Sequence, residues 1–108
     1  MIRGDLVTVA LPGDFGKPRP ALVIQSDLFN ETHPTVTLLP LTSEIRSAPQ
    51  FRITVEPSTA NSLRLVSQIM VDKPMTFRRD KIREPFGRLE NDILMRVSRA
   101  LAVWIGIA

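Results

Sequence analysis

Arg19-Pro20-Ala21-Leu22-Val23-Ile24-Gln25 is the stretch that decides the expected fold. It is an almost uninterrupted apolar run of strand length, which is typical of a strand buried on both faces. We therefore expect it in the centre of a sheet. Pro20 fits only near the start of such a strand, because proline has no N–H to donate to a neighbour. Residues 12–18, just before it, are mostly Pro, Gly and Asp and predict a loop.

Outward from this strand, four further segments have the pattern of strands. Residues 5–11 and 51–55 alternate between apolar and polar side chains, as strands with one buried face do. Residues 35–41 predict another strand, which we expect to end at Pro40. Residues 63–71 predict a fifth strand. Polar segments connect all of these.

The last third of the chain predicts a helix. Residues 77–84 are charged and are expected to hold one helical turn. Acidic residues near position 90 are typical of a helix start. The apolar side chains that follow recur at spacings of four, four and three, so that they share one helix face: Ile93, Val97, Leu101 and Trp104. Arg96 and Arg99 point away from this face, and we expect Trp104 to be the last core residue of the helix.

Five short strands and a terminal helix predict a mainly β protein with a C-terminal helix, arranged as a small, strongly bent SH3-like β-barrel. No repeat or linker divides the chain, so residues 1–108 are expected to form a single domain. The longest apolar stretch, residues 100–108, is far shorter than the roughly 20 residues of a membrane span. With no signal-like N-terminus and no cysteine, the chain is expected to be soluble and cytoplasmic.

The charge of the chain favours an anionic partner. Its formal net charge is +3, and its 14 basic residues are eleven arginines and three lysines. Arginine carries a planar fork of donors that suits phosphate oxygens, so nucleic acid or an acidic protein is the expected partner. His33 is the one histidine, which excludes a two-histidine nuclease mechanism within one chain. No metal-ligand spacing is present, and we expect neither a metal nor any other cofactor.

Two strand ends carry the residues that suit phosphate chemistry. Arg19 lies where a loop enters the central strand, and Thr42 and Ser43 lie where another strand leaves for a loop. These ends can meet in an antiparallel barrel. An arginine beside a hydroxyl at the rim of a sheet is a credible phosphate-binding pair.

These segments resemble the MazF/PemK toxins of bacterial toxin–antitoxin systems. The resemblance covers nearly the whole chain and includes an amphipathic C-terminal helix. Its segments are Arg3-Gly4-Asp5, Arg19-Pro20-Ala21-Leu22-Val23-Ile24, Pro40-Leu41-Thr42 and Ser67-Gln68-Ile69. It implies an SH3-like barrel homodimer that cuts single-stranded RNA at short sequences without metal. It also implies a cognate antitoxin that lays a flexible segment over the RNA groove.

The resemblance assigns catalysis to Arg19 and Thr42. It implies that the 2′-hydroxyl of the RNA attacks the adjacent phosphorus and leaves a 2′,3′-cyclic phosphate and a 5′-hydroxyl. Lys17, Ser43 and Gln68 are expected to contact the RNA. The chain departs from the related Kid-type toxins, which have an aspartate where Ser67 stands and a histidine in the first loop. The general base therefore stays open.

Two other interpretations stay open. Glu90-Asn91-Asp92-Ile93 and the end of the helix near Trp104 resemble CcdB, a gyrase poison on the same barrel without nuclease chemistry. CcdB-like proteins do not carry the Arg19-Pro20 and Thr42 pair, which favours the nuclease. The second alternative is a non-catalytic RNA-binding barrel that uses the basic stretch of residues 73–88. Only 6% of the residues are aromatic, so few side chains are available to stack on RNA bases. In each case the apolar end of the helix predicts a homodimer.

Overall fold

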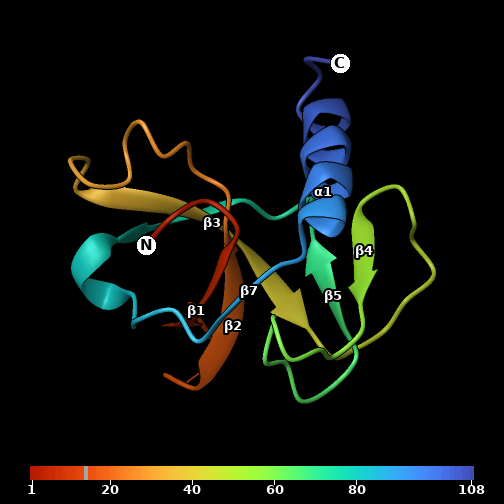
Figure 1. The fold of residues 1–108 in the computed structure, drawn as a ribbon, viewed down its shortest axis with the longest axis horizontal. Helices are drawn as coiled ribbons and strands as arrows, with labels where there is room; N and C mark the ends of the chain where they lie inside the picture. Colours follow the sequence, from red (N-terminus) through yellow and green to blue (C-terminus); the bar gives the residue numbers. More distant parts are fainter. Residues whose placement is uncertain (14) are drawn as a thin grey trace.

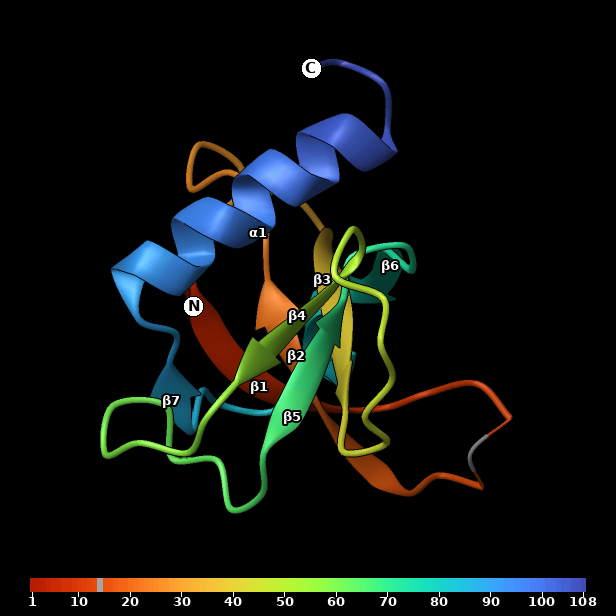
Figure 2. The same cartoon turned by 90° about the vertical axis from the view of Figure 1, so that its right-hand side faces the viewer.

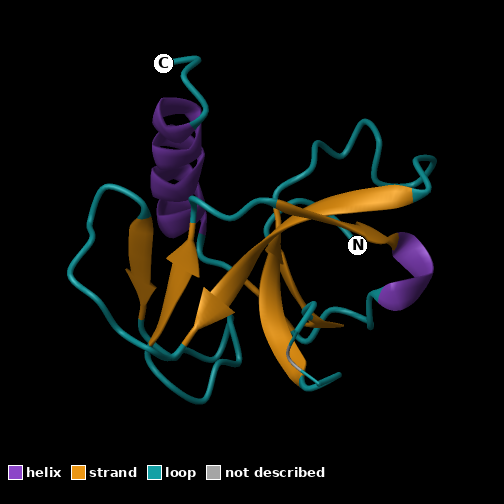
Figure 3. Cartoon of the chain, turned by 180° about the vertical axis from the view of Figure 1, so that it is seen from behind, coloured by secondary structure: helices purple, strands orange, loops and turns teal. Residues whose placement is uncertain are grey.

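The computed structural model describes residues 1–13 and 15–108. Within them it contains one antiparallel sheet of seven strands and a C-terminal α-helix (Figure 1). The elements are β1 (Asp5–Ala10), β2 (Pro18–Val23), β3 (Thr35–Thr42), β4 (Arg52–Val55), β5 (Ser67–Met70), β6 (Met75–Arg78), β7 (Gly87–Arg88) and α1 (Asn91–Trp104), with a single 3-10 turn at Arg79–Lys81. The strand order is β4-β5-β3-β2-β1-β7, and β6 also pairs with β3. The sheet curls as an SH3-like half-barrel, and the predicted fold class is confirmed (Figure 3).

Strand β3 makes the sheet curl because it changes partner along its length. On one side it pairs with β2, from Leu38 to Pro40. On the other side, its first half pairs with β6 and its last two residues, Leu41 and Thr42, pair with β5. Pro40 was expected to end the strand, but β3 continues to Thr42. Pro40 lies between the two partners on that side, where a residue without an N–H interrupts no continuous ladder.

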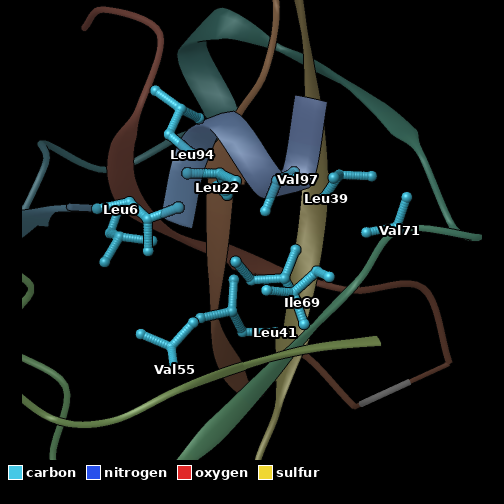
Figure 4. Close-up of a cluster of buried hydrophobic side chains, with 11 residues drawn as sticks. Leu6, Leu22, Leu39, Leu41, Val55, Ile69, Val71, Leu94 and Val97 are labelled. Carbon is cyan, nitrogen blue, oxygen red and sulfur yellow. The ribbon is translucent and has the colours of Figure 1, made fainter. Parts of the chain in front are cut away.

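The sheet separates two cores, and β2 contributes to both. Leu22 packs with side chains of β3, β5 and the helix, including Leu94 and Val97 (Figure 4). Ala21 and Val23, which point to the opposite face, pack in the second cluster with residues of β1 and β3. The prediction of a central strand buried on both faces is therefore confirmed.

Helix α1 lies across one end of the curled sheet (Figure 2). Leu94 and Val97 are its buried residues, and Arg96 and Arg99 are exposed as predicted. Trp104 was expected to be a core residue, but it is 50% exposed and packs against Phe51 with ring centroids 5.6 Å apart. No helix in the described part of the chain is long and apolar enough to cross a membrane.

The largest difference from the expected strands is at residues 63–71. The strand there is only Ser67–Met70, and residues 62–66 form a loop. Asn61 organises that loop: its buried amide oxygen accepts hydrogen bonds from the backbone N–H groups of Ser58 and Leu63, and the φ of Ser62 is +56°. An asparagine that binds neighbouring backbone groups competes with a strand. Residues 75–78 form strand β6, which overlaps the first two residues of the segment expected to hold one helical turn. The expected turn is present within that segment as the 3-10 turn Arg79–Lys81.

Candidate active site

Arg19 and Thr42 face each other at one end of β2 and β3. In the ladder between these strands, Ala21 pairs with Pro40. Two residues further along the same register, Arg19 lies opposite Thr42 and on the same face of the sheet, because side chains alternate with period two. Arg19 stays paired with Val9 of β1, and Thr42 with Gln68 of β5. At this end β2 is therefore paired with β1 and β3 is paired with β5, but β2 and β3 are no longer paired with each other.

The space between the unpaired ends of β2 and β3 opens into a groove made of three adjoining hollows, and Arg19 lines all three. One of about 220 Å³ lies between Arg19, Thr42 and the loop that carries Arg64. A second, of about 370 Å³, lies on the other side of Thr42 and is lined by Glu44. A third, of about 660 Å³, continues past Arg19 to Arg83. Among the described residues that line the groove, Glu44 is the one acid beside three arginines, so the groove suits an anion.

The sequence around Arg19 stiffens its backbone. Pro18 and Pro20 flank it, and each proline fixes its own φ and restricts the residue before it. A side chain on such a segment loses little backbone freedom when it binds a ligand. Arg19 itself is half-buried at the strand end.

The hydroxyl of Thr42 is oriented by the turn that follows it. Its Oγ1 accepts a hydrogen bond of 3.1 Å from the backbone N–H of Glu44. The O–H of Thr42 is then available to donate to a ligand. Ser43 is exposed and lines the same two hollows as Thr42, so the structure brings Arg19, Thr42 and Ser43 together.

Lys17 and Gln68 lie elsewhere. Lys17 is exposed in the loop just before β2 and lines none of the three hollows. Gln68 is 4% exposed, and its side-chain amide is bound to the loop after β3. Its Oε1 accepts from the backbone N–H of Arg46 at 3.0 Å, and its Nε2 donates to the carbonyl of Arg46 at 2.9 Å. Gln68 thus fixes the loop that begins at Thr42.

Glu44 brings a carboxylate to the groove that the sequence did not single out. It forms an ion pair of 2.8 Å with Arg46. The hydrogen bond from Arg46, and then its positive charge, hold the pKa of Glu44 below the ordinary value. His33 precedes the opposite end of β3, an eight-residue strand about 25 Å long. It is therefore too far from Thr42 to act in the groove.

The groove wall opposite Thr42 is tied to the start of the helix. Asn61 Nδ2 donates to Glu90 Oε1 at 3.2 Å, and Ser58 Oγ donates to Glu90 Oε2 at 2.7 Å. The bond from Ser58 is the main reason that the pKa of Glu90 is lowered. Gly87 lies so close that a Cβ there would approach the Asn61 carbonyl oxygen to 2.3 Å. The contacts with Glu90 and Gly87 thus hold the start of the loop that carries Arg64.

Arg64 and Arg83 are basic groove residues that the sequence does not place beside Arg19. Arg64 falls within residues 63–71, whose pattern predicts a strand, and Arg83 falls in the basic stretch of residues 73–88, which only the RNA-binding-barrel interpretation uses. No local signal distinguishes either, because only the fold brings them beside Arg19. In the described part of the chain, no group of three or more His, Cys, Asp or Glu side chains is placed to hold a metal ion.

The fold and the groove define a small curled-sheet protein with an arginine-lined groove at the open end of two strands. A family model described as PemK-like, MazF-like toxin of type II toxin-antitoxin system matches residues 2–105. The chain therefore belongs to this toxin family, as the sequence resemblance indicated.

Individual relatives agree with this assignment. A protein of Mycolicibacterium smegmatis named as a probable endoribonuclease MazF is 44% identical over the whole chain and 99% of its own length. A mycobacterial endoribonuclease solved with its cognate antitoxin superposes with a TM-score of 0.84 at 20% identity, over 100% of this chain and 97% of that one. A MazE-MazF structure from Deinococcus radiodurans gives 0.78 at 22% identity, over 100% and 98%. At these identities the structural likeness shows the fold alone.

Proposed function

We propose that this protein is a sequence-specific endoribonuclease toxin that cleaves single-stranded RNA, mRNA in particular, and so inhibits translation. The observation that carries the proposal is the pair of Arg19 and Thr42, opposite each other across the open end of the β2–β3 ladder in a basic groove. The relative that is 44% identical is named as a probable endoribonuclease, which supports the same activity.

The proposed reaction is an internal transfer that needs no metal. The 2′-oxygen attacks the adjacent phosphorus, the bond from phosphorus to the 5′-oxygen breaks, and a 2′,3′-cyclic phosphate and a 5′-hydroxyl result. Arg19 donates hydrogen bonds to the phosphorane oxygens as their charge grows, and it helps protonation of the leaving 5′-oxygen by a hydrogen bond to it while that oxygen takes a proton from water. The O–H of Thr42 donates to a non-bridging oxygen. Glu44 is the one carboxylate among the described residues that line the groove, so it is the candidate to accept the 2′-hydroxyl proton.

The partners follow from the same proposal. We propose that the RNA lies along the groove with contacts from Lys17 and Ser43, and that Gln68 acts next to it through the loop it holds. Residues 1–108 act as one toxin domain in a homodimer in the cytoplasm. A cognate antitoxin neutralises the toxin. In support, the mycobacterial endoribonuclease of the same fold was solved in complex with its cognate antitoxin, and the Deinococcus structure is of MazE-MazF.

The direct test is incubation with a long single-stranded RNA in the presence of EDTA, with the fragment ends mapped. We expect discrete cuts with cyclic-phosphate and 5′-hydroxyl ends. Inactivity on varied RNAs, together with trapping of gyrase on cleaved DNA, would instead support the CcdB-like alternative. The family assignment does not favour that alternative.

Arg19 provides the sharpest variant. Arg19→Lys keeps the charge but loses the two-pronged donor geometry, so cleavage should fall about 100- to 1,000-fold while RNA affinity changes little. Arg19→Ala should be at least as inactive and still folded, and Thr42→Ala should lose less. The matched control is Arg78→Lys in β6, an exposed arginine outside the groove. Arg19→Ala cleaving at the parental rate would remove Arg19 from the active site.

A further inference from the structure

A second basic hollow lies outside the active groove. It has a volume of about 240 Å³ and is lined by three arginines from three different elements: Arg46 from the β3–β4 loop, Arg52 from β4 and Arg96 from α1. In Figure 1 the β3–β4 loop runs along the outer side of β4 and enters that strand near the lower end of α1. No acidic residue lines the hollow within the described part of the chain.

The arginine at the base of the hollow is held in place. Arg52 Nη1 donates to the Glu44 carbonyl at 2.9 Å and to Gln68 Oε1 at 3.3 Å, and its Nη2 lies 3.7 Å from Met70 Sδ. These contacts use three of the five N–H donors of the guanidinium. A partly anchored guanidinium binds an anion with less loss of side-chain entropy than a free one.

The charges around the hollow leave a positive excess. The carboxylate of Glu44 compensates Arg46, with which it pairs. Arg96 is exposed on α1 and has no hydrogen bond or ion pair with any described residue. Arg52 and Arg96 therefore present two positive charges on a surface that a single carboxylate does not neutralise.

The hollow and the active groove are linked through Arg52, which contacts two residues that line the groove. Glu44 and Met70 line the groove together with Thr42, and both of them contact Arg52. A bound polymer that extends from Thr42 over the surface of these two residues would therefore reach Arg52 at the base of the second hollow.

We propose that this hollow is a phosphate subsite for the same RNA strand, holding a phosphodiester that flanks the scissile one. The proposal rests on the proposed function, because it takes the groove at Arg19 to hold RNA. A flexible polyanion that already has one phosphate at Arg19 presents the next phosphates at regular intervals along its backbone. Arginine forks bind phosphate oxygens with two parallel hydrogen bonds.

The test compares Arg96→Gln with Arg99→Gln, a control on the same helix whose side chain does not line the hollow. The probe is 2′-O-methylated RNA of mixed sequence and increasing length, which binds but cannot be cleaved, and binding is followed by fluorescence anisotropy at several salt concentrations. Arg96→Gln should weaken binding of long strands about two- to fivefold and leave the shortest strands unaffected. The slope of log affinity against log salt should fall by about 0.7 for the lost contact.

An equal loss in Arg99→Gln, or no loss in Arg96→Gln and Arg46→Gln, would overturn the subsite. So would a loss confined to an acidic peptide such as polyglutamate, which would assign the hollow to a protein partner. The two proposals fail separately. If longer strands bind more tightly through Arg96 but unmodified RNA is not cleaved, the nuclease function is refuted and the phosphate subsite stands. If RNA is cleaved but Arg96→Gln binds it as tightly as the parent, the subsite is refuted and the nuclease function stands.

Discussion

Replacing Gln68 by alanine decides between a side chain that contacts RNA and one that holds the active-site loop. The Gln68 amide makes four side-chain hydrogen bonds: with the backbone N–H and C=O of Arg46, with Arg52 Nη1 and with Thr54 Oγ1. Each is worth about 1 kcal/mol net, and unsatisfied backbone groups of Arg46 add to the loss. We therefore expect Gln68→Ala to lower the free energy of unfolding by about 2–4 kcal/mol and the melting temperature by about 10–20 °C.

The assay is urea unfolding combined with hydrogen exchange at the Arg46 amide. Thr54→Val is the matched control, since it removes one of the four bonds at an exposed position and should cost less than about 1 kcal/mol. Exchange at Arg46 should accelerate in Gln68→Ala and stay slow in the control. If Gln68→Ala keeps the parental stability and loses only RNA affinity, the loop-holding role is refuted and direct contact stands.

Three further outcomes are expected. If Glu44 is the general base, its lowered pKa places the acid limb of kcat/KM below about pH 4.5, and an inflection near pH 6.5 would contradict this. The pKa of Glu90 is also lowered, so the hydrogen bond from Ser58 stabilises the fold above about pH 4.3, and this stabilisation is lost as the pH falls. Glu90→Gln should therefore lower the free energy of unfolding by about 1 kcal/mol at pH 7, and thermal melts at acid pH should show a progressively smaller difference. Trp104 and Ile105 are about half exposed, so light scattering should show a homodimer at micromolar concentration that Ile105→Glu weakens; a monomeric parent would contradict it.

The sequence predicted the features that depend on local pattern. The apolar run of β2 indicated burial on both faces, and Leu22 and Ala21 do point into different cores. The placement of Arg19 and Thr42 at strand ends was also readable, because a polar residue at each end of an apolar run marks the rim of a sheet. Their direct opposition needed the register, which no local pattern specifies.

The missed features depend on contacts between distant segments. Strand β7 is two residues long and exists because Gly87 and Arg88 pair with β1. Residues 63–66 are apolar apart from Arg64 and have the pattern of a strand, but the side chain of Asn61 bends the backbone into a loop and leaves Leu65 exposed. Arg64 enters the groove only as a result of that bend.

The position of the groove follows from the way β3 is shared. Its pairing with β2 stops after Pro40, while Leu41 and Thr42 pair with β5 on the other edge and Arg19 stays paired with β1. The donors on the two strands therefore flank a space beyond the end of the β2–β3 pairing that the described residues form. A substitution that extended the β2–β3 ladder would close that space, even if it stabilised the sheet. We expect such a variant to lose RNA affinity while gaining stability, since the open end of the ladder serves binding and not folding.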